Sequence, residues 1–330
     1  MLHHFSSGRR WPRRARLPYR FYRPRLEQLE SRVAPATITV TTASLSHQPG
    51  ETTFLDALGQ ANQDPGLDTI KFNMPGPGPH VISEKNYGFD PNRIIYPVII
   101  DATLGLNFTP TTPQIVLDVP NIGIDILPTA AGSTIRGLAI TTSFSPWFTG
   151  IRLQGSGNYI EGNTIGFDPS GTVPSGATDP DIPTAGILVQ SAGNTIGGPA
   201  PDPTGGSSAF DPGNVIGGNT YGIFIDGPFG GTETTIQGNK IGMRGDGSTP
   251  APNVEGILVY SSDGNTIGGS AATRNVVSGN SNTNIELRGY CWDLGSGCSG
   301  CFRHRPGSRC PACRPPLRVP WSWRIPQGAG

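Results

Sequence analysis

The sequence has no cysteine before residue 291, no long apolar run and very little helical periodicity. Because residues 1–290 lack cysteine, the fold of that region needs no disulfide bonds. No stretch approaches the roughly 20 consecutive apolar residues of a membrane-spanning helix, so no transmembrane span is expected. Between residues 133 and 288, no ten residues show helical spacing of apolar side chains, and the many glycines would penalise a helix. These absences exclude arrays of helical repeats.

Positive charge is also scarce in the middle of the chain. The formal net charge is zero only because residues 1–32 carry +7, residues 33–287 carry −13 and residues 288–330 carry +6. A surface that binds nucleic acid needs positive charge to contact the phosphates. The acidic middle therefore argues against nucleic acid as its partner.

One phrase, a glycine followed by alternating apolar residues, recurs through this middle region. Its copies GIRL, GILV, GIFI and GILV begin at Gly150, Gly186, Gly222 and Gly256, which are 36, 36 and 34 residues apart. Phrases built on asparagine, β-branched residues and glycine, such as NTIGG, lie between the copies. Self-similarity at such a period predicts a solenoid, in which each repeated unit stacks on the next.

The residues inside each unit indicate which kind of solenoid forms. The phrases are short, β-branched and bounded by Gly or Asn, which is typical of strands separated by tight corners. The sequence therefore predicts an all-β fold, a parallel β-helix. Asparagine tolerates the left-handed backbone region that a corner requires, and its side-chain amides can stack from coil to coil. We expect four asparagines to sit at matching corners and to act as architecture with the four glycines: Asn163, Asn194, Asn239 and Asn265.

Residues 51–73 contain the one segment that reads as a helix. Its apolar residues with helical spacing are Phe54, Leu55, Leu58 and Ala61. Thr52 or Thr53 is suited to begin the helix, and Asn62 with Pro65 to end it. We expect a helix over about 52–62, followed by the strand DTIKF, to cap the solenoid, because an uncovered end exposes its core and unpaired backbone groups.

Two stretches resemble known families. The capping segment is similar to the SLRxAI…AN…DTIxF segment of bacterial surface β-helix proteins, and residues 38–288 resemble right-handed parallel β-helix proteins of the pectin-lyase-like superfamily. RLEQLESRVAPA at 25–36 resembles the LExLExR…PA signature that opens many planctomycete cell-surface proteins. These resemblances imply a right-handed coil, which agrees with the usual hand of parallel crossovers, and a location at the cell surface or outside the cell.

The ends of the chain differ from the middle. Residues 9–25 are basic and rich in proline, and although Arg9 and Arg10 form a twin-arginine pair, no apolar run of a secretory signal follows. We therefore divide the chain into a disordered, export-like arm at 1–37, an N-terminal cap at 38–80, β-helix coils at 81–288 and an anomalous tail at 289–330.

The tail permits two interpretations. It contains all five cysteines, and Cys298, Cys301, Cys310 and Cys313 form two CxxC pairs that are suited to bind Zn²⁺. Residues 290–330 also contain no Asn, Thr or Lys but are rich in Arg, Pro, Gly and Cys, which is the bias of a shifted reading frame in GC-rich DNA. The second interpretation makes the tail an unstructured segment and leaves the last coil uncapped.

Three functional interpretations follow. The first is a non-catalytic protein, monomeric and without a cofactor, that has a structural, adhesive or polysaccharide-contacting role in the cell envelope or matrix. The second, implied by the superfamily resemblance, is a polysaccharide lyase or glycoside hydrolase that uses clustered acids and a basic residue. Its candidate residues are Asp118, Asp125, Glu161, Asp226, Arg136 and Arg152, of which the two arginines are expected to share a face. The third is a scaffold stabilised by Ca²⁺ at the equivalent loops of Asp168 and Asp246.

Overall fold

The computed structural model describes residues 34–84, 92–103, 113–143, 145, 148–167, 184–198 and 211–289. The chain divides into two units, Met1–Arg32 and Val33–Gly330, and every described residue belongs to the second. The predictions for the basic arm, for most of the signature at 25–36, for the tail beyond residue 289 and for Asp168, Cys298, Cys301, Cys310 and Cys313 fall outside the described residues.

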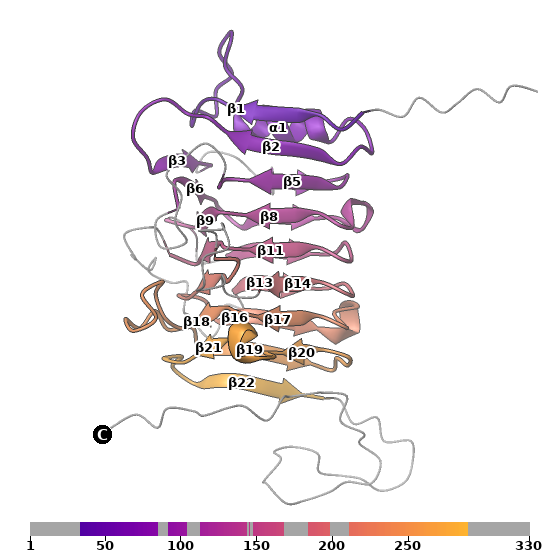
Figure 1. Ribbon diagram of the computed structural model, residues 1–330, viewed down its shortest axis with the longest axis vertical. Coiled ribbons are helices and arrows are strands. Elements are labelled where there is room, and N and C mark those ends of the chain that lie inside the picture. The colour runs from indigo at the N-terminus through magenta and orange to yellow at the C-terminus, as the bar shows by residue number, and fades with distance from the viewer. Residues whose placement is uncertain are drawn as a thin grey trace, which may run out of the picture. The chain divides into compact units, whose positions relative to one another are not determined.

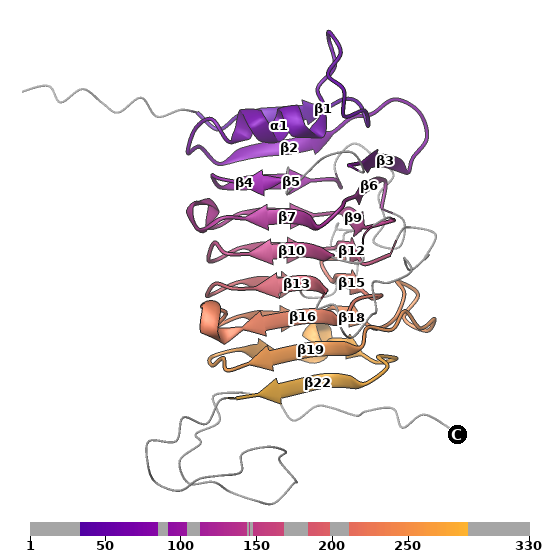
Figure 2. The ribbon, with the colours of Figure 1, turned by 180° about the vertical axis from the view of Figure 1, so that it is seen from behind.

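Three sheets of parallel strands form the walls of the described unit (Figures 1 and 2). Sheet A contains β1 (Thr37–Val40), β2 (Asp68–Phe72), β5 (Val98–Asp101), β8 (Thr134–Arg136), β11 (Tyr159–Glu161), β14 (Thr195–Gly197), β17 (Thr235–Gln237) and β20 (Thr266–Ile267). Sheet B contains β3 (His80–Ser83), β6 (Ile115–Asp118), β9 (Leu138–Thr141), β12 (Thr164–Ile165), β15 (Val215–Ile216), β18 (Lys240–Ile241) and β21 (Val276–Val277). Sheet C contains β4 (Arg93–Ile94), β7 (Ile122–Ile126), β10 (Thr149–Leu153), β13 (Ala185–Val189), β16 (Tyr221–Asp226), β19 (Glu255–Tyr260) and β22 (Thr283–Arg288). The helices are α1 (Phe54–Ala61) and the short 3-10 turns η1 (Pro128–Ala130), η2 (Gly227–Phe229) and η3 (Ala271–Thr273).

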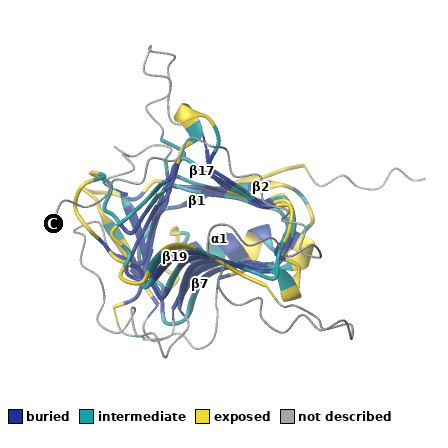
Figure 3. Cartoon of the chain, turned by 90° about the horizontal axis from the view of Figure 1, so that it is seen from below, coloured by how far each residue is buried: buried dark blue, intermediate teal, exposed yellow. Residues whose placement is uncertain are grey.

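The strands pair with copies of themselves one coil away, which confirms the all-β parallel β-helix. In sheet C, Ile151 pairs with Ile187, Ile187 with Ile223 and Ile223 with Ile257, so the glycine-apolar phrase stacks on itself. All four isoleucines are fully buried. Figure 3 shows the buried strands in dark blue around the interior of the coil. The core is therefore a set of apolar columns parallel to the stacking direction.

The asparagines form columns too, but not the single column that the sequence suggested. Asn163 and Asn239 precede strands of sheet B, whereas Asn194 and Asn265 precede strands of sheet A. The prediction that all four occupy matching corners was therefore wrong. Each coil has two corners with the same backbone requirement, so the same Asn–β-branched–Gly phrase appears at both. The phrase alone therefore does not show which corner an asparagine occupies.

Within a column, each side-chain amide donates to the oxygen of the next. The column before sheet B contains Asn163, Asn214, Asn239 and Asn275, with Nδ2–Oδ1 distances of 3.1, 2.9 and 3.1 Å. Each Oδ1 of Asn214, Asn239 and Asn275 also accepts from the backbone N–H of the preceding asparagine, at 3.0 Å in each case. Because these groups are buried, the column satisfies polar atoms that would otherwise destabilise the corner.

The four predicted glycines do occupy matching positions. A Cβ built on Gly150 would lie 2.6 Å from the carbonyl oxygen of Gly186, and one on Gly186 would lie 2.6 Å from that of Gly222. The same clash recurs between Gly222 and Gly256 at 2.5 Å. Glycine is therefore required here because neighbouring coils approach too closely for any side chain.

The cap helix forms as expected. Thr53 begins α1: its side chain accepts from the Asp56 N–H at 3.0 Å while Asp56 accepts from the Thr53 N–H at 3.1 Å, a capping box. Asn62 ends the helix. Phe54, Ala57, Leu58 and Ala61 face the core and are buried, so α1 covers the first coil.

Candidate functional site

The six charged residues proposed for catalysis lie on three different sheets. Asp118 ends β6 of sheet B, Arg136 and Glu161 end β8 and β11 of sheet A, and Asp125, Arg152 and Asp226 belong to sheet C. The expectation that Arg136 and Arg152 share a face was wrong. A coil passes through all three sheets, so two residues only 16 positions apart stand on different walls of the solenoid.

Each of the two arginines instead pairs with an aspartate one coil earlier. Arg152 donates from Nε and Nη2 to the two carboxylate oxygens of Asp125, at 2.8 and 2.7 Å. Arg136 donates from Nη2 to Asp101 at 2.5 Å. Both pairs are register partners in a parallel sheet, and both carboxylates are almost fully buried. These ion pairs act as links between coils and leave no free acid–base pair at either place.

Glu161 continues the charged column of sheet A beyond Arg136. Burial raises the pKa of its carboxyl, Arg136 lowers it and Asp101 raises it. Glu161 is therefore a neighbour of the Asp101–Arg136 pair on sheet A, whereas the other candidate acids belong to sheets B and C.

A buried acidic cluster lies where sheet B meets sheet C. Asp118 accepts from the Ser143 N–H and hydroxyl, both at 2.7 Å, while Glu84 accepts from Asn92 Nδ2 at 2.8 and 3.0 Å. Glu84 is fully buried. Burial raises its pKa to about 7, the hydrogen bond from Asn92 lowers it and the Asp118 charge raises it. Glu84 was not recognised from the sequence, because nothing local marks its burial.

The raised pKa of Glu84 predicts a pH-dependent stability. A carboxyl whose pKa is raised on folding stabilises the protein fully below its unfolded pKa of 4.5, and this contribution is lost as the pH rises through about 7. We expect Glu84→Gln to remove this dependence and to raise the free energy of unfolding by up to about 3 kcal/mol at pH 8, with a much smaller change at pH 4. Urea unfolding of both proteins at the two pH values measures the effect. An equal change at both pH values would contradict it.

The outer face of sheet C carries a partly exposed apolar column, in which Leu188 and Phe224 are half-buried and Leu258 is only 2% exposed. Leu188, Phe224 and Leu258 are register partners on β13, β16 and β19. Their chain neighbours Ile187, Ile223 and Ile257 are fully buried, so strand alternation turns this column outward. Tyr221 and Tyr260 flank Phe224, with ring centroids 5.2 and 6.4 Å from its ring. We call these five residues the sheet C platform.

Charged clusters bound the platform at both ends. Arg152, which pairs with Asp125, is the register partner of Leu188 on the preceding coil. Glu286 is the register partner of Leu258 on the following coil. Arg288 Nη2 donates to Glu255 at 2.7 Å and to Glu286 at 3.0 Å. Since these charges are largely paired with each other, the platform between them is apolar and close to neutral.

Polar side chains also reach the platform from its side. Gln190 Nε2 lies 3.4 Å from Asp226 Oδ2. Gln190 is two residues after Leu188 in the chain, and Asp226 is two residues after Phe224. Burial raises the pKa of Asp226, while the hydrogen bond from Gln190 lowers it. Asp226 is the one candidate acid that adjoins the aromatic side chains of the platform.

The sequence contains a signal for the platform. In the repeated phrase, the third residue changes from Arg in GIRL to Leu, Phe and Leu in the later copies. Once the second and fourth residues are assigned to the core, the third must face outward. An outward position that becomes apolar or aromatic over three successive coils indicates a packed column, and its partly exposed members Leu188 and Phe224 can serve as a contact surface.

The proposed Ca²⁺ residue Asp246 is engaged in its own turn. Its carboxylate accepts from the Ser248 and Thr249 N–H groups at 2.9 and 2.8 Å and from the Thr249 hydroxyl at 2.5 Å. These hydrogen bonds, chiefly that of the Thr249 hydroxyl, lower its pKa to about 2. Among the described residues, no group of three or more His, Cys, Asp or Glu side chains is arranged to hold a metal ion.

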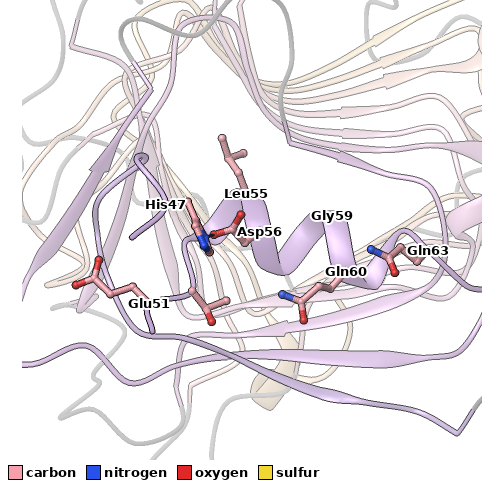
Figure 4. Close-up of a pocket in the computed structure, with 8 residues that line it drawn as sticks. His47, Glu51, Leu55, Asp56, Gly59, Gln60 and Gln63 are labelled. Carbon is pink, nitrogen blue, oxygen red and sulfur yellow. Dashed lines mark hydrogen bonds and ion pairs between the residues drawn. The ribbon is translucent and has the colours of Figure 1, made fainter. Parts of the chain in front are cut away.

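A shallow cavity of about 360 Å³ lies beside the cap helix (Figure 4). Its lining is polar and includes His47, Glu51, Asp56, Gln60 and Gln63. His47 Nδ1 is 3.0 Å from Asp56 Oδ2, and Asp56 already holds the start of α1. We assign this corner to the capping of the helix.

Comparison with known proteins adds no further constraint. No family model, no curated protein and no solved structure matches the chain. In the described part of the chain, no helix has the length and apolar character required to cross a membrane.

Proposed function

We propose that this protein is a non-catalytic β-helix scaffold that binds a polysaccharide on the sheet C platform, at the cell surface or outside the cell. The observation that carries the proposal is the group of half-buried side chains Leu188, Phe224, Tyr221 and Tyr260, which is backed by the buried Leu258. Aromatic rings with a few hydrogen-bonding neighbours provide apolar contact area together with orientation. Half-buried Gln190 is placed to supply a hydrogen bond, and the buried Asp226 orients its side-chain amide.

The charge of the platform favours a neutral ligand. The arginines at its two ends are paired with Asp125, Glu255 and Glu286, so little positive charge remains for an acidic polymer. The superfamily resemblance also implied a lyase or hydrolase. That alternative has less support, because its candidate acids lie on three different sheets, whereas a glycosidase needs two carboxylates within about 5 to 10 Å of each other.

Affinity electrophoresis in gels that contain a neutral β-glucan, xylan, pectin or alginate tests the proposal. We expect one of the neutral polymers to retard the protein. Phe224→Ala should weaken that binding about tenfold or more, because truncation of a central aromatic side chain commonly costs over 1.4 kcal/mol.

Phe229→Ala is the matched control. Phe229 lies on η2, is 69% exposed and does not belong to the platform, so its removal should leave binding unchanged. Equal binding by wild type and Phe224→Ala, or equal losses in both variants, would contradict the platform. Turnover of a polymer that disappears when one acid is substituted would favour the enzyme instead.

A further inference from the structure

The last described strand leaves one edge open. β22 pairs with β19, and no strand among the residues that the structure describes pairs with its other side. Ile285 and Leu287 are register partners of the core residues Ile257 and Val259. Yet Ile285 is 37% and Leu287 57% exposed, against 0% and 2% for those two partners. Within the described part of the chain, two side chains in core positions therefore have no covering layer, and no strand pairs with the backbone beside them.

The opposite end of the coil stack is closed. α1 places Phe54, Ala57, Leu58 and Ala61 against the first coil (Figure 1). A second copy therefore cannot stack its open end on this capped end to build a filament. The open ends of two copies can only meet each other, which gives a closed two-fold pair.

The sequence of β22, TNIELR, is suited to pair with itself in the antiparallel direction. Core-facing residues must oppose core-facing residues, which limits the possible registers. If Leu287 opposes Leu287 of the second copy, the Glu286–Arg288 ion pair within each copy (2.7 Å) meets that of the other copy with opposite charges facing, twice across the two-fold axis. The register shifted by one residue in each copy would instead place Glu286 against Glu286. Opposite charges directly across a strand pair stabilise it, whereas like charges destabilise it.

We propose that two copies of this chain form a head-to-head dimer through antiparallel pairing of their β22 strands, with Leu287 at the two-fold axis and Glu286–Arg288 ion pairs on both sides. The partner is a second copy because the open edge is self-complementary in both polarity and charge. This inference does not depend on the proposed polysaccharide binding. An unpaired edge is a template for pairing with another chain, and here the capped far end limits the assembly to two copies.

Sedimentation velocity of the full chain over two orders of magnitude in concentration tests the dimer. We expect reversible conversion from monomer to dimer, with no larger species. Leu287→Lys should shift the dissociation constant upward about a hundredfold or abolish the dimer, because it places two charges against each other at the axis. Glu286→Lys should act in the same direction, since it faces Arg288 of the second copy. Leu67→Lys, at another exposed leucine (43% exposed), should leave the dimer intact.

A second measurement covers variants that fail to fold. Hydrogen exchange of the wild-type chain should show that the β22 amides become more protected as concentration rises, while those of β1 do not change. A wild-type chain that stays monomeric at every concentration overturns the proposal, as does an open-ended series of larger species. A monomeric full chain that dimerises only when cut after Gly289 would assign the edge to residues 290–330 and would also overturn it.

Discussion

Asn239→Ala is expected to lower the free energy of unfolding by about 3 kcal/mol or more, because it leaves several buried polar groups without partners. Asn239 Oδ1 accepts from both the backbone N–H and the side-chain amide of Asn214, at 3.0 and 2.9 Å. Its own Nδ2 donates to the carbonyl oxygens of Ile196 and Gln237 and to Asn275. One truncation thus disturbs three coils at once.

Urea unfolding followed by circular dichroism measures this loss. Asn73→Ala is the control, because Asn73 is exposed and its backbone N–H, bonded to Val40, is unaffected by the substitution. Its stability should stay within about 0.5 kcal/mol of wild type. Asn239→Asp should be about as harmful as Asn239→Ala at neutral pH, since it turns a carboxylate toward three acceptor oxygens. If Asn239→Ala matched the control, the asparagine column would have no role in stability.

Gly186→Ala should destabilise the protein by about 2 to 3 kcal/mol, although it adds a single methyl group. The new Cβ would lie 2.6 Å from the carbonyl oxygen of Gly222 and 2.7 Å from Cγ2 of Ile216. The carbonyl belongs to the hydrogen-bonded backbone of sheet C and cannot move without disturbing the next coil. Neighbouring coils would therefore have to separate at the centre of the stack.

Gly59→Ala provides a control of opposite sign. Gly59 lies within α1, and a Cβ there would meet no atom within 4 Å. Because alanine favours helices more than glycine, this variant should gain about 0.5 to 1 kcal/mol. Thermal or urea unfolding of the two variants side by side would separate them clearly. A neutral Gly186→Ala would show that the coils approach less closely than described.

The features that could be predicted from the sequence are those that each coil repeats. Gly150 and its counterparts, the inward apolar residues and the start of the cap helix at Thr52 or Thr53 all follow from local residue patterns. The corner that each asparagine occupies could not be predicted, because Asn163 and Asn194 stand in the same local phrase at different corners. The link between Arg152 and Asp125 was also hidden, since it joins residues 27 positions apart whose only relation is the register of the stack.

The candidate site was less predictable for a related reason. The platform is built from residues such as Leu188 and Phe224, which are ordinary within their own strands. They form a surface only when coils of unequal length come into register, and the alternation of a single strand does not reveal which columns will be outward and apolar. Of the six charged residues proposed for catalysis, Asp125, Arg136 and Arg152 are occupied by ion pairs between coils.

The asparagine column also explains how much sequence this architecture can absorb. Asn163 and Asn214 are 51 residues apart and Asn214 and Asn239 only 25, yet their amides meet at nearly the same distance. The chain between two consecutive asparagines of the column can thus be about twice as long in one coil as in another without altering the column. New segments can therefore be inserted at such corners during evolution or engineering, provided that the flanking asparagines return to their column.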